Sequence, residues 1–234
     1  MKERARAAFF DAGNTLLYAW PSVGEVYAEF AHRYGVAAGA PAIGAAFRKV
    51  WNDKDLENER LGQGLQKDEK AWWKRIVARV FDGFPPFADF DAFFEDLYVS
   101  FGDSSRWRLY DDAREALEGL AARSVPMAIV SNWDSRLLPL LEGLEIARYF
   151  RTVVISAVEG SSKPEGRIFQ IACERMGVPP NAAIHIGDSL EDDIQGALAA
   201  GLRPIWIDRF HSTAPVPAGA RKIQDLRELP ASFD

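Results

Sequence analysis

Between Tyr110 and Asp208 the sequence alternates short apolar runs with longer amphipathic stretches. Apolar residues recur every three or four positions in the amphipathic stretches, which predicts helices, and the short runs are typical of strands buried on both faces. Strands that alternate with helices form a parallel sheet covered by helices on both faces. The predicted strands are Ala7–Phe10, Met127–Val130, Thr152–Ile155, Ala183–Ile186 and Pro204–Ile207. We therefore predict an α/β fold with a doubly wound parallel sheet, in which the first of these strands is central.

The segment between the first two predicted strands breaks this alternation and contains only helical patterns. The predicted helices of this segment begin near Ser22, Pro41, Asp68 and Asp89. Aromatic side chains form stripes along these helices, which favours a bundle core over a cofactor site. We expect two domains, a core of residues 1–17 and 107–234 and an inserted four-helix cap of residues 18–106.

Composition excludes several functions. Acidic residues exceed basic ones, 34 to 28, and the net charge of −6 argues against nucleic-acid binding. Cys173 is the only cysteine, so no internal disulfide can form, and its helical context predicts an inert buried thiol. No apolar stretch has the length of a signal peptide or a membrane span. We expect a cytoplasmic protein that acts on a small molecule and binds neither nucleic acid nor a membrane; no oligomeric state is predicted.

Polar residues follow the ends of three predicted strands. Asp11 follows the first strand, Ser131 and Asn132 follow the second, and Asp188 comes just after the strand that ends at Ile186. A lysine, Lys163, lies in a loop before a predicted helix. Ligands of open parallel sheets bind beyond the carboxyl ends of the strands. The sequence therefore predicts carboxylates, a hydroxyl and an ammonium around one point, which is suited to a phosphate.

The charges of these residues predict their roles. A Mg²⁺ ion between Asp11 and Asp188 would neutralise both carboxylates, and oxygen ligands without His or Cys favour this metal. Lys163 would pair with the phosphate and the nucleophile, while the Ser131 hydroxyl and the amide of Asn132 would donate to phosphate oxygens. Asp11 would attack phosphorus and form an aspartyl-phosphate, which water hydrolyses.

Other polar residues of these segments have separate interpretations. Thr15 lies at the turn that follows the first strand. We predict that it binds substrate and that its hydroxyl fixes the backbone of the turn. We predict that Asp193 is a catalytic residue that orients Lys163 or a metal-bound water. Asp192 opens a predicted helix, where the helix dipole favours acidic residues, and is interpreted as a solvated charge. His185, inside a strand, is interpreted as structural.

Taken together, these motifs resemble those of the haloacid dehalogenase-like hydrolase superfamily. The matching segments, in order, are Asp11…Thr15, Ser131, Lys163 and Gly187-Asp188…Asp193. The helical insert is similar to the helical cap of that family. The resemblance implies a Rossmann-like core, Asp11 as nucleophile, and Mg²⁺ held by Asp11, Asp188 and the backbone carbonyl of Gly13. It also implies that the cap covers the site and selects the substrate.

One position departs from the family pattern. Phosphatases of the family carry an aspartate where this chain has Gly13, and that aspartate protonates the leaving oxygen. Glycine cannot do so, and general acid catalysis is typically worth about 10²–10⁴-fold, so we expect weak or specialised phosphatase activity. Trp133 would either wall the leaving-group pocket or pack beneath the cap.

Four functions are therefore compared. The main prediction is a Mg²⁺-dependent phosphohydrolase acting on a small phosphorylated metabolite. The first alternative is a metal-independent haloacid hydrolase, in which Asp11 attacks carbon and a cap arginine (Arg33, Arg48 or Arg60) holds the substrate carboxylate; the retained Gly187-Asp188 pair favours a metal instead. Phosphonate cleavage would need a cap lysine, for which the candidates are Lys49, Lys54, Lys67, Lys70 and Lys74. The last alternative is an interaction protein that binds phosphate without turnover.

Overall fold

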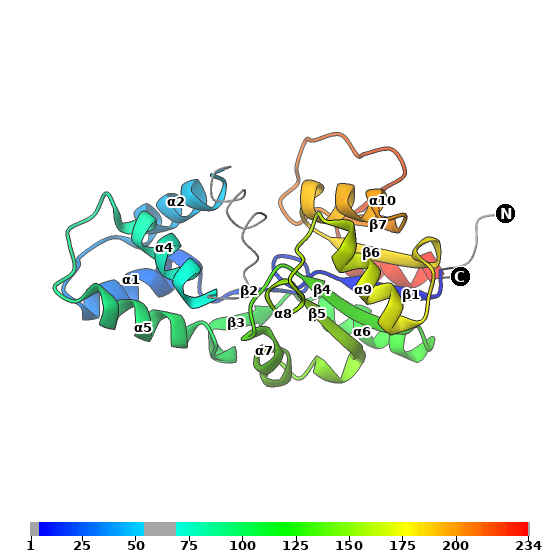
Figure 1. Cartoon of the computed structure of the whole chain (residues 1–234), viewed down its shortest axis with the longest axis horizontal. Coiled ribbons are helices and arrows are strands. Elements are labelled where there is room, and N and C mark those ends of the chain that lie inside the picture. Colours follow the sequence, from blue (N-terminus) through cyan, green and yellow to red (C-terminus); the bar gives the residue numbers. More distant parts are fainter. Residues whose placement is uncertain (1–4, 54–68, 234) are drawn as a thin grey trace. The chain divides into compact units, whose positions relative to one another are not determined.

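The structure of the chain is a computed structural model that describes residues 5–53 and 69–233. The chain divides into two compact units. The first consists of Met1–Tyr18 and Leu109–Asp234, and the second of Ala19–Arg108. Within the described residues, no helix combines the length and the apolar character that a membrane crossing requires. Figure 1 labels the elements along the chain.

Six parallel strands form the sheet of the first unit, in the order β5-β4-β1-β6-β7-β8. Their bounds are β1 Ala7–Phe10, β4 Met127–Ser131, β5 Phe150–Ile155, β6 Ala183–Gly187, β7 Arg203–Ile207 and β8 Arg221–Ile223. The chain passes from β1 to β4 and β5 on one side and then returns to β6 on the other side of β1. The strand order therefore reverses between β1 and β6. This confirms the predicted doubly wound parallel sheet with a central first strand.

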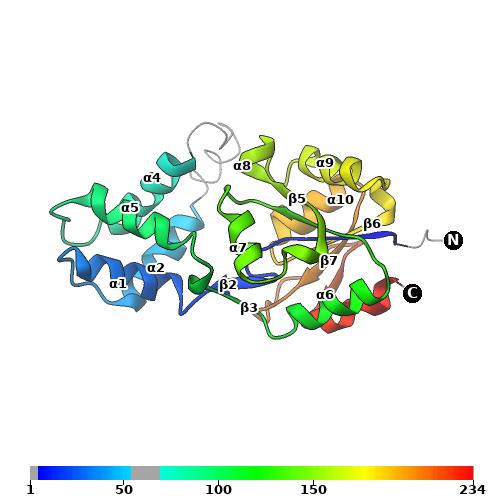
Figure 2. The ribbon, with the colours of Figure 1, turned by 90° about the horizontal axis from the view of Figure 1, so that it is seen from below.

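Helices cover both faces of this sheet (Figure 2). The helices α9 (Gly166–Met176) and α10 (Gly196–Ala199) lie on one face, and α6 (Ala113–Ala122) and η6 (Leu226–Phe233) lie on the other. The shorter helices of this unit are α7 Leu137–Gly143, η3 Ala147–Tyr149, α8 Ser156–Glu159, η4 Pro180–Ala182 and η5 Leu190–Gln195. Phe9 of β1 packs in a buried cluster with Phe169 of α9. Since side chains alternate along a strand, Phe10 faces the opposite layer.

The second unit is helical. Its main helices are α1 Val23–Arg33, α2 Ala40–Trp51, α4 Glu69–Phe81 and α5 Phe90–Ser100, and η2 spans Ser104–Arg106. The helix α1 begins next to Ser22 as predicted, and Ser22 caps it: its Oγ accepts a hydrogen bond from the backbone N–H of Glu25 at 3.2 Å. The aromatic stripes form the buried core of this bundle, with Tyr27, Trp72 and Phe93 among its members.

One predicted feature falls outside the structure, and one observed feature was not predicted. The predicted helix start at Asp68 lies outside the described residues. A short two-stranded sheet of β2 (Leu17–Ala19) and β3 (Trp107–Leu109) was not predicted. Runs of three residues are too short for apolar periodicity to mark them.

Candidate active site

The candidate site lies at the carboxyl edge of the sheet. Asp11 directly follows β1, Ser131 ends β4, and Asp188 directly follows β6. Because these strands are adjacent and parallel, their carboxyl ends meet at one edge. The backbone N–H of Asp11 extends the pairing by donating to the carbonyl of Ile186 at 2.9 Å. This edge lies where the strand order reverses, which is where such sheets bind ligands.

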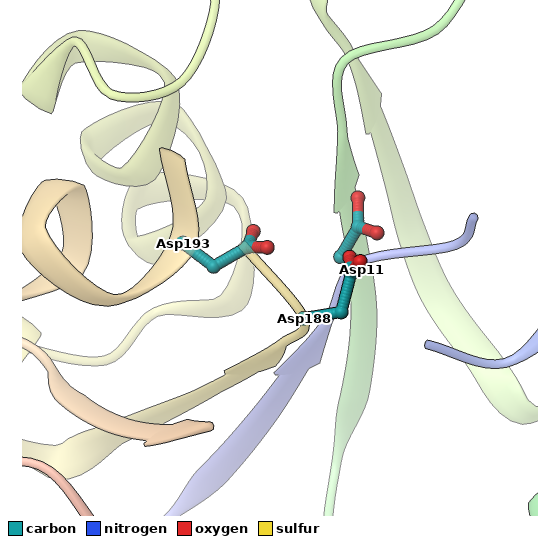
Figure 3. Close-up of side chains that lie close together, drawn as sticks. All are labelled: Asp11, Asp188 and Asp193. Atoms are coloured by element: carbon teal, nitrogen blue, oxygen red, sulfur yellow. The ribbon is translucent and has the colours of Figure 1, made fainter. Parts of the chain in front are cut away.

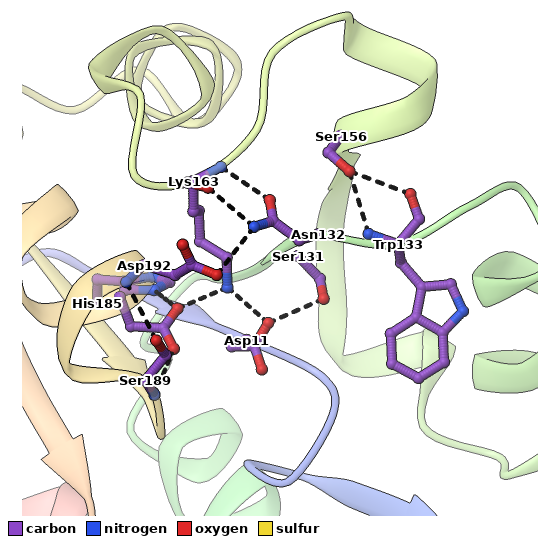
Figure 4. Close-up of polar contacts among 10 residues, drawn as sticks. Asp11, Ser131, Asn132, Trp133, Ser156, Lys163, His185, Ser189 and Asp192 are labelled. Atoms are coloured by element: carbon purple, nitrogen blue, oxygen red, sulfur yellow. Dashed lines mark hydrogen bonds and ion pairs between the residues drawn. The ribbon is translucent and has the colours of Figure 1, made fainter. Parts of the chain in front are cut away.

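Asp11 receives two hydrogen bonds on one carboxylate oxygen (Figure 4). The Oγ of Ser131 donates to Oδ1 at 2.8 Å, and the Nζ of Lys163 donates to the same atom at 2.6 Å. All three side chains are buried. Residues that are 120 and 152 positions apart from Asp11 in the sequence thus converge on a single oxygen atom.

Lys163 continues this network to a second carboxylate. Its Nζ donates to Oδ1 of Asp193 at 2.5 Å, and Nε2 of His185 lies 2.9 Å from the same oxygen. Burial alone would lower the pKa of Lys163, but the charges of Asp11 and Asp193 raise it above its ordinary value. Burial alone would raise the pKa of Asp193, yet the Lys163 ammonium keeps it low. The pair is therefore an ammonium and a carboxylate.

His185 is part of this network and is not only a packing residue. Burial lowers the pKa of His185, so its ring is neutral. Among the described residues, its Nδ1 has no hydrogen-bond partner. A proton on Nδ1 would therefore be buried without an acceptor, which places the ring proton on Nε2, where it is donated to Asp193. The sequence interpretation of His185 as structural missed this contact.

The helical turn that carries Asp193 is fixed by a close approach of its side chain to the backbone of Gly187 and Ser189. The backbone N–H of Ser189 donates to Oδ2 of Asp193 at 3.0 Å. A Cβ atom at Gly187 would lie only 2.1 Å from Cγ of Asp193. Residue 187 must therefore be glycine for the Asp193 carboxylate to occupy its place. The helix that was predicted to begin near Asp192 is divided here into η5, a π-helical turn, and α10.

Asn132 positions the loop of Lys163. Its Nδ2 donates to the carbonyl of Lys163 at 2.9 Å, and its Oδ1 accepts from the backbone N–H of Lys163 at 2.8 Å. The same Nδ2 lies 3.2 Å from Oδ2 of Asp192, which is half-buried. The interpretation of Asp192 as a solvated charge was therefore wrong, because this carboxylate accepts a hydrogen bond within the site.

Three carboxylates gather at this edge (Figure 3). One oxygen each of Asp11, Asp188 and Asp193 lies within 4.8 Å of the others. Withdrawal from water, with the charges of Asp11 and Asp193, raises the pKa of Asp188 well above its ordinary value. Burial likewise raises the pKa of Asp11, although Lys163 opposes this. If all three carboxylates are ionised, as they would be around a cation, the one ammonium of Lys163 leaves two negative charges for that cation to compensate.

The predicted role of the Thr15 hydroxyl in fixing the backbone of the turn is not observed. The side chain is fully buried, and among the described residues its hydroxyl has no hydrogen-bond partner. The carbonyl of Thr15 instead accepts a hydrogen bond from Arg209 at 2.7 Å.

Arg209 is a residue that the sequence analysis missed. Its guanidinium binds both oxygens of Asp112, at 2.6 and 2.9 Å, and packs over the ring of Tyr110 at 4.0 Å. It thereby ties the loop after Asp11 to the start of α6. The available signal was its position two residues after a buried strand, at the same sheet edge as the other polar residues.

Gly13 and the predicted cap residues have the following surroundings. Trp133 packs directly against Gly13, with ring carbon Cζ3 lying 3.1 Å from where a Cβ of residue 13 would be. In the second unit, Lys70 and Lys74 are paired with Glu95 and Asp91. Arg33 is paired with Glu29, and Arg48 and Lys49 lie on α2. The remaining candidates, Lys54, Arg60 and Lys67, lie outside the described residues.

Comparisons with known proteins agree with this geometry. The family of haloacid dehalogenase-like hydrolases matches residues 5–201. Haloacid dehalogenase-like hydrolase domain-containing protein 3 of Mus musculus is 33% identical over 206 residues, which cover 86% of this chain and 81% of that protein. A phosphoserine phosphatase of Thermus thermophilus is 33% identical over 131 residues, 55% of this chain and 53% of its own length.

A solved structure has the same fold. L-2-haloacid dehalogenase from Xanthobacter autotrophicus, with chloropropionic acid covalently bound, superimposes with a TM-score of 0.76 at 20% identity, covering 97% of both chains. At that identity the likeness concerns the fold alone. The family match, by contrast, spans most of the chain and includes every strand end that carries a site residue. The chain therefore belongs to the haloacid dehalogenase-like hydrolase family.

Proposed function

We propose that this hydrolase is a Mg²⁺-dependent phosphohydrolase that acts on a small phosphorylated molecule through an aspartyl-phosphate on Asp11. The observation that carries the proposal is the cluster of three carboxylates, Asp11, Asp188 and Asp193, against the one ammonium of Lys163. Such a cluster favours a divalent cation, and a bound cation favours a phosphate dianion. The likeness to a phosphoserine phosphatase supports chemistry at phosphorus.

Mg²⁺ fits the donor atoms at this edge. Carboxylate oxygens that lie within 4.8 Å of one another are hard ligands of the kind this ion prefers. Both oxygens of Asp193 already accept hydrogen bonds, Oδ1 from Lys163 and Oδ2 from the backbone N–H of Ser189, so we assign the ion to Asp11, Asp188 and the backbone carbonyl of Gly13. When bound, Mg²⁺ neutralises carboxylates and polarises a phosphate oxygen.

The hydrogen bonds of Asp11 favour one of its oxygens as the nucleophile. Oδ1 accepts from Ser131 and Lys163, so we assign the attack to Oδ2. A bond forms between Oδ2 and phosphorus while the bond from phosphorus to the leaving oxygen breaks, and the leaving oxygen keeps the electron pair. Water then adds to phosphorus, the bond to Asp11 breaks, and one proton passes to solvent.

The neighbours of Asp11 would stabilise the charge on the transferred group. The ammonium of Lys163 and the hydroxyl of Ser131 lie against the nucleophile and can donate to phosphate oxygens beside it. Since the side-chain amide of Asn132 is bonded to the Lys163 loop, we assign the donation from this residue to its backbone N–H. Asp193 acts as a positioning residue that holds Lys163.

A substrate panel with and without Mg²⁺ tests this function. We expect release of phosphate from p-nitrophenyl phosphate or acetyl phosphate that needs Mg²⁺ and is lost in Asp11→Asn. The control is Asp91→Asn in α5, which removes an exposed carboxylate and should leave the rate unchanged.

Two results would contradict the proposal in different ways. Release of halide from haloacids in the presence of EDTA would identify attack on carbon. Binding of Mg²⁺ and phosphate without turnover of any phosphoryl compound would identify a binding protein.

A further inference from the structure

The nucleophile has an aromatic neighbour where a side chain of residue 13 would lie. A Cβ atom at Gly13 would lie 3.1, 3.8 and 4.0 Å from Cζ3, Cη2 and Cε3 of the Trp133 indole. All three atoms belong to the six-membered ring, and residue 13 is two positions beyond Asp11. The indole therefore takes the space into which a larger residue 13 would extend.

The backbone of Trp133 is fixed in this place. The Oγ of Ser156 lies 3.2 Å from both the backbone N and the carbonyl of Trp133, and the N–H of Ala157 donates to that carbonyl at 3.2 Å. Figure 4 shows the indole on the opposite side of Ser131 from Lys163. The two sides of the nucleophile thus differ, with an ammonium on one and an apolar ring on the other.

The polar side chains that the structure places against Asp11 are engaged in other contacts or, like Asp188, are assigned to the metal. Ser131 and Lys163 both donate to Asp11 itself. Asp193 is held as a carboxylate between Lys163 and the His185 ring. The indole of Trp133 carries an N–H that can donate a hydrogen bond but is not an acid.

We propose that Gly13 and Trp133 together restrict this enzyme to phosphoryl compounds whose leaving group departs without a proton, above all acyl phosphates. The proposal rests on the proposed function. In the first step the bond between phosphorus and the acyl oxygen breaks, and the acyl group leaves as a carboxylate that keeps the electron pair. An alkyl phosphate would have to release a strongly basic alkoxide, which normally requires a general acid worth about 10²–10⁴-fold.

Because Trp133 contacts Gly13, substitutions at the two positions should depend on each other. An aspartate introduced at Gly13 alone would press against the Trp133 ring, because even its Cβ lies closer to the ring than ordinary contact distance. Removal of the ring alone opens space but supplies no acid. Only the two substitutions together provide both the acid and the room for it, so their effects should be strongly non-additive.

A double-mutant cycle measures this coupling. We would determine kcat/KM for acetyl phosphate and for glycerol phosphate, with Mg²⁺, in the unaltered enzyme, Gly13→Asp, Trp133→Ala and the double variant. The unaltered enzyme should prefer acetyl phosphate. The double variant should gain about 10²–10⁴-fold on glycerol phosphate and little on acetyl phosphate, while each single variant gains less than about tenfold. Gly83→Asp, at a glycine with no atom within 4 Å of an added Cβ, is the control for an added carboxylate.

A measurement on the unaltered enzyme avoids any question of variant folding. Across a series of substituted phenyl phosphates, the rate should fall steeply as the leaving phenolate becomes more basic. A flat dependence, or equal rates on acetyl and glycerol phosphate, would overturn the proposal while leaving the proposed function intact. A full gain in Gly13→Asp alone would show that Trp133 has no part in the restriction. Absence of turnover with every phosphoryl compound would instead overturn the proposed function.

Discussion

At the scale of single residues, the site depends on one buried cation. The ammonium of Lys163 bonds to Asp11 at 2.6 Å and to Asp193 at 2.5 Å, and its side chain is only 2% exposed. The charge of this one lysine therefore offsets the cost of burying two carboxylates. A buried ion pair that loses one partner leaves a buried charge without compensation, which is the costly case.

Lys163→Met tests this dependence. We expect a loss of about 3–5 kcal/mol of unfolding free energy, because Asp11 and Asp193 are left buried without a counter-charge. We also expect kcat to fall by at least about 10²-fold, because a donor to the transferred group is lost. Urea denaturation and steady-state kinetics measure the two effects. Lys70→Met removes the exposed partner of Glu95 and should cost less than about 1 kcal/mol; equal losses in both variants would contradict the prediction.

Whereas the charge of Lys163 stabilises the folded protein, the negative charge of Asp188 destabilises it. Its pKa in the folded protein is raised well above the ordinary 3.8, so the folded state holds this proton more tightly than the unfolded chain does. The resulting stabilisation is complete below pH 3.8 and is lost as the pH rises through the folded-state pKa.

It follows that Asp188→Asn should stabilise the metal-free protein at neutral pH. The variant keeps the shape of the side chain but removes the repulsion by Asp11 and Asp193. Its advantage in melting temperature, measured in EDTA, should grow from acidic to neutral pH. An advantage that is constant with pH, or a variant less stable than the unaltered protein at neutral pH, would count against the assigned charge cluster.

At the scale of elements, the periodicity of apolar residues in the sequence predicted where strands and helices lie. The buried strand Ala7–Phe10 has its predicted bounds, because a short apolar run bounded by polar residues has well-defined ends. The contacts that orient the site were not predictable in this way. The bond from Arg209 to the Thr15 carbonyl joins residues 194 positions apart, and the π-helical turn that aims Asp193 has an ordinary helical sequence pattern. Convergence at the strand ends followed from topology, whereas these contacts depend on tertiary packing.

The junction of β6 and η5 gives a prediction at this scale. Gly187→Ala would bring a Cβ within 2.1 Å of Asp193 Cγ and force the turn away from Lys163. We expect a loss of about 1–3 kcal/mol of stability in urea denaturation together with a loss of activity. Gly83→Ala adds the same methyl group where nothing lies within 4 Å and should change stability by less than about 0.5 kcal/mol. An unchanged Gly187→Ala protein would show that the turn is not tightly constrained.

At the scale of the whole molecule, the candidate site links cation binding to folding. The uncompensated carboxylates exist as a cluster only when β1 and β6 are paired, since Asp11 and Asp188 are 177 positions apart in the sequence. A cation that binds this cluster therefore binds the folded state and stabilises it by mass action.

Thermal unfolding with added Mg²⁺ tests this linkage. At a free Mg²⁺ concentration one hundred times its Kd, the ion should add about 2.7 kcal/mol to the unfolding free energy, and the melting temperature should rise accordingly. In Asp188→Asn the rise should be abolished or much smaller. The same Mg²⁺ response in both proteins would place the ion elsewhere.

The central claim is that Asp11 becomes phosphorylated with the help of a metal held beside it. The most direct test is to mix the protein with acetyl phosphate and Mg²⁺, quench with acid within the first turnover, and determine the mass of the peptide that contains Asp11. We predict one added phosphoryl group on Asp11, absent in EDTA and absent in Asp11→Asn. A peptide that is never modified while phosphate is released, or a phosphoryl group on another residue, would contradict the mechanism.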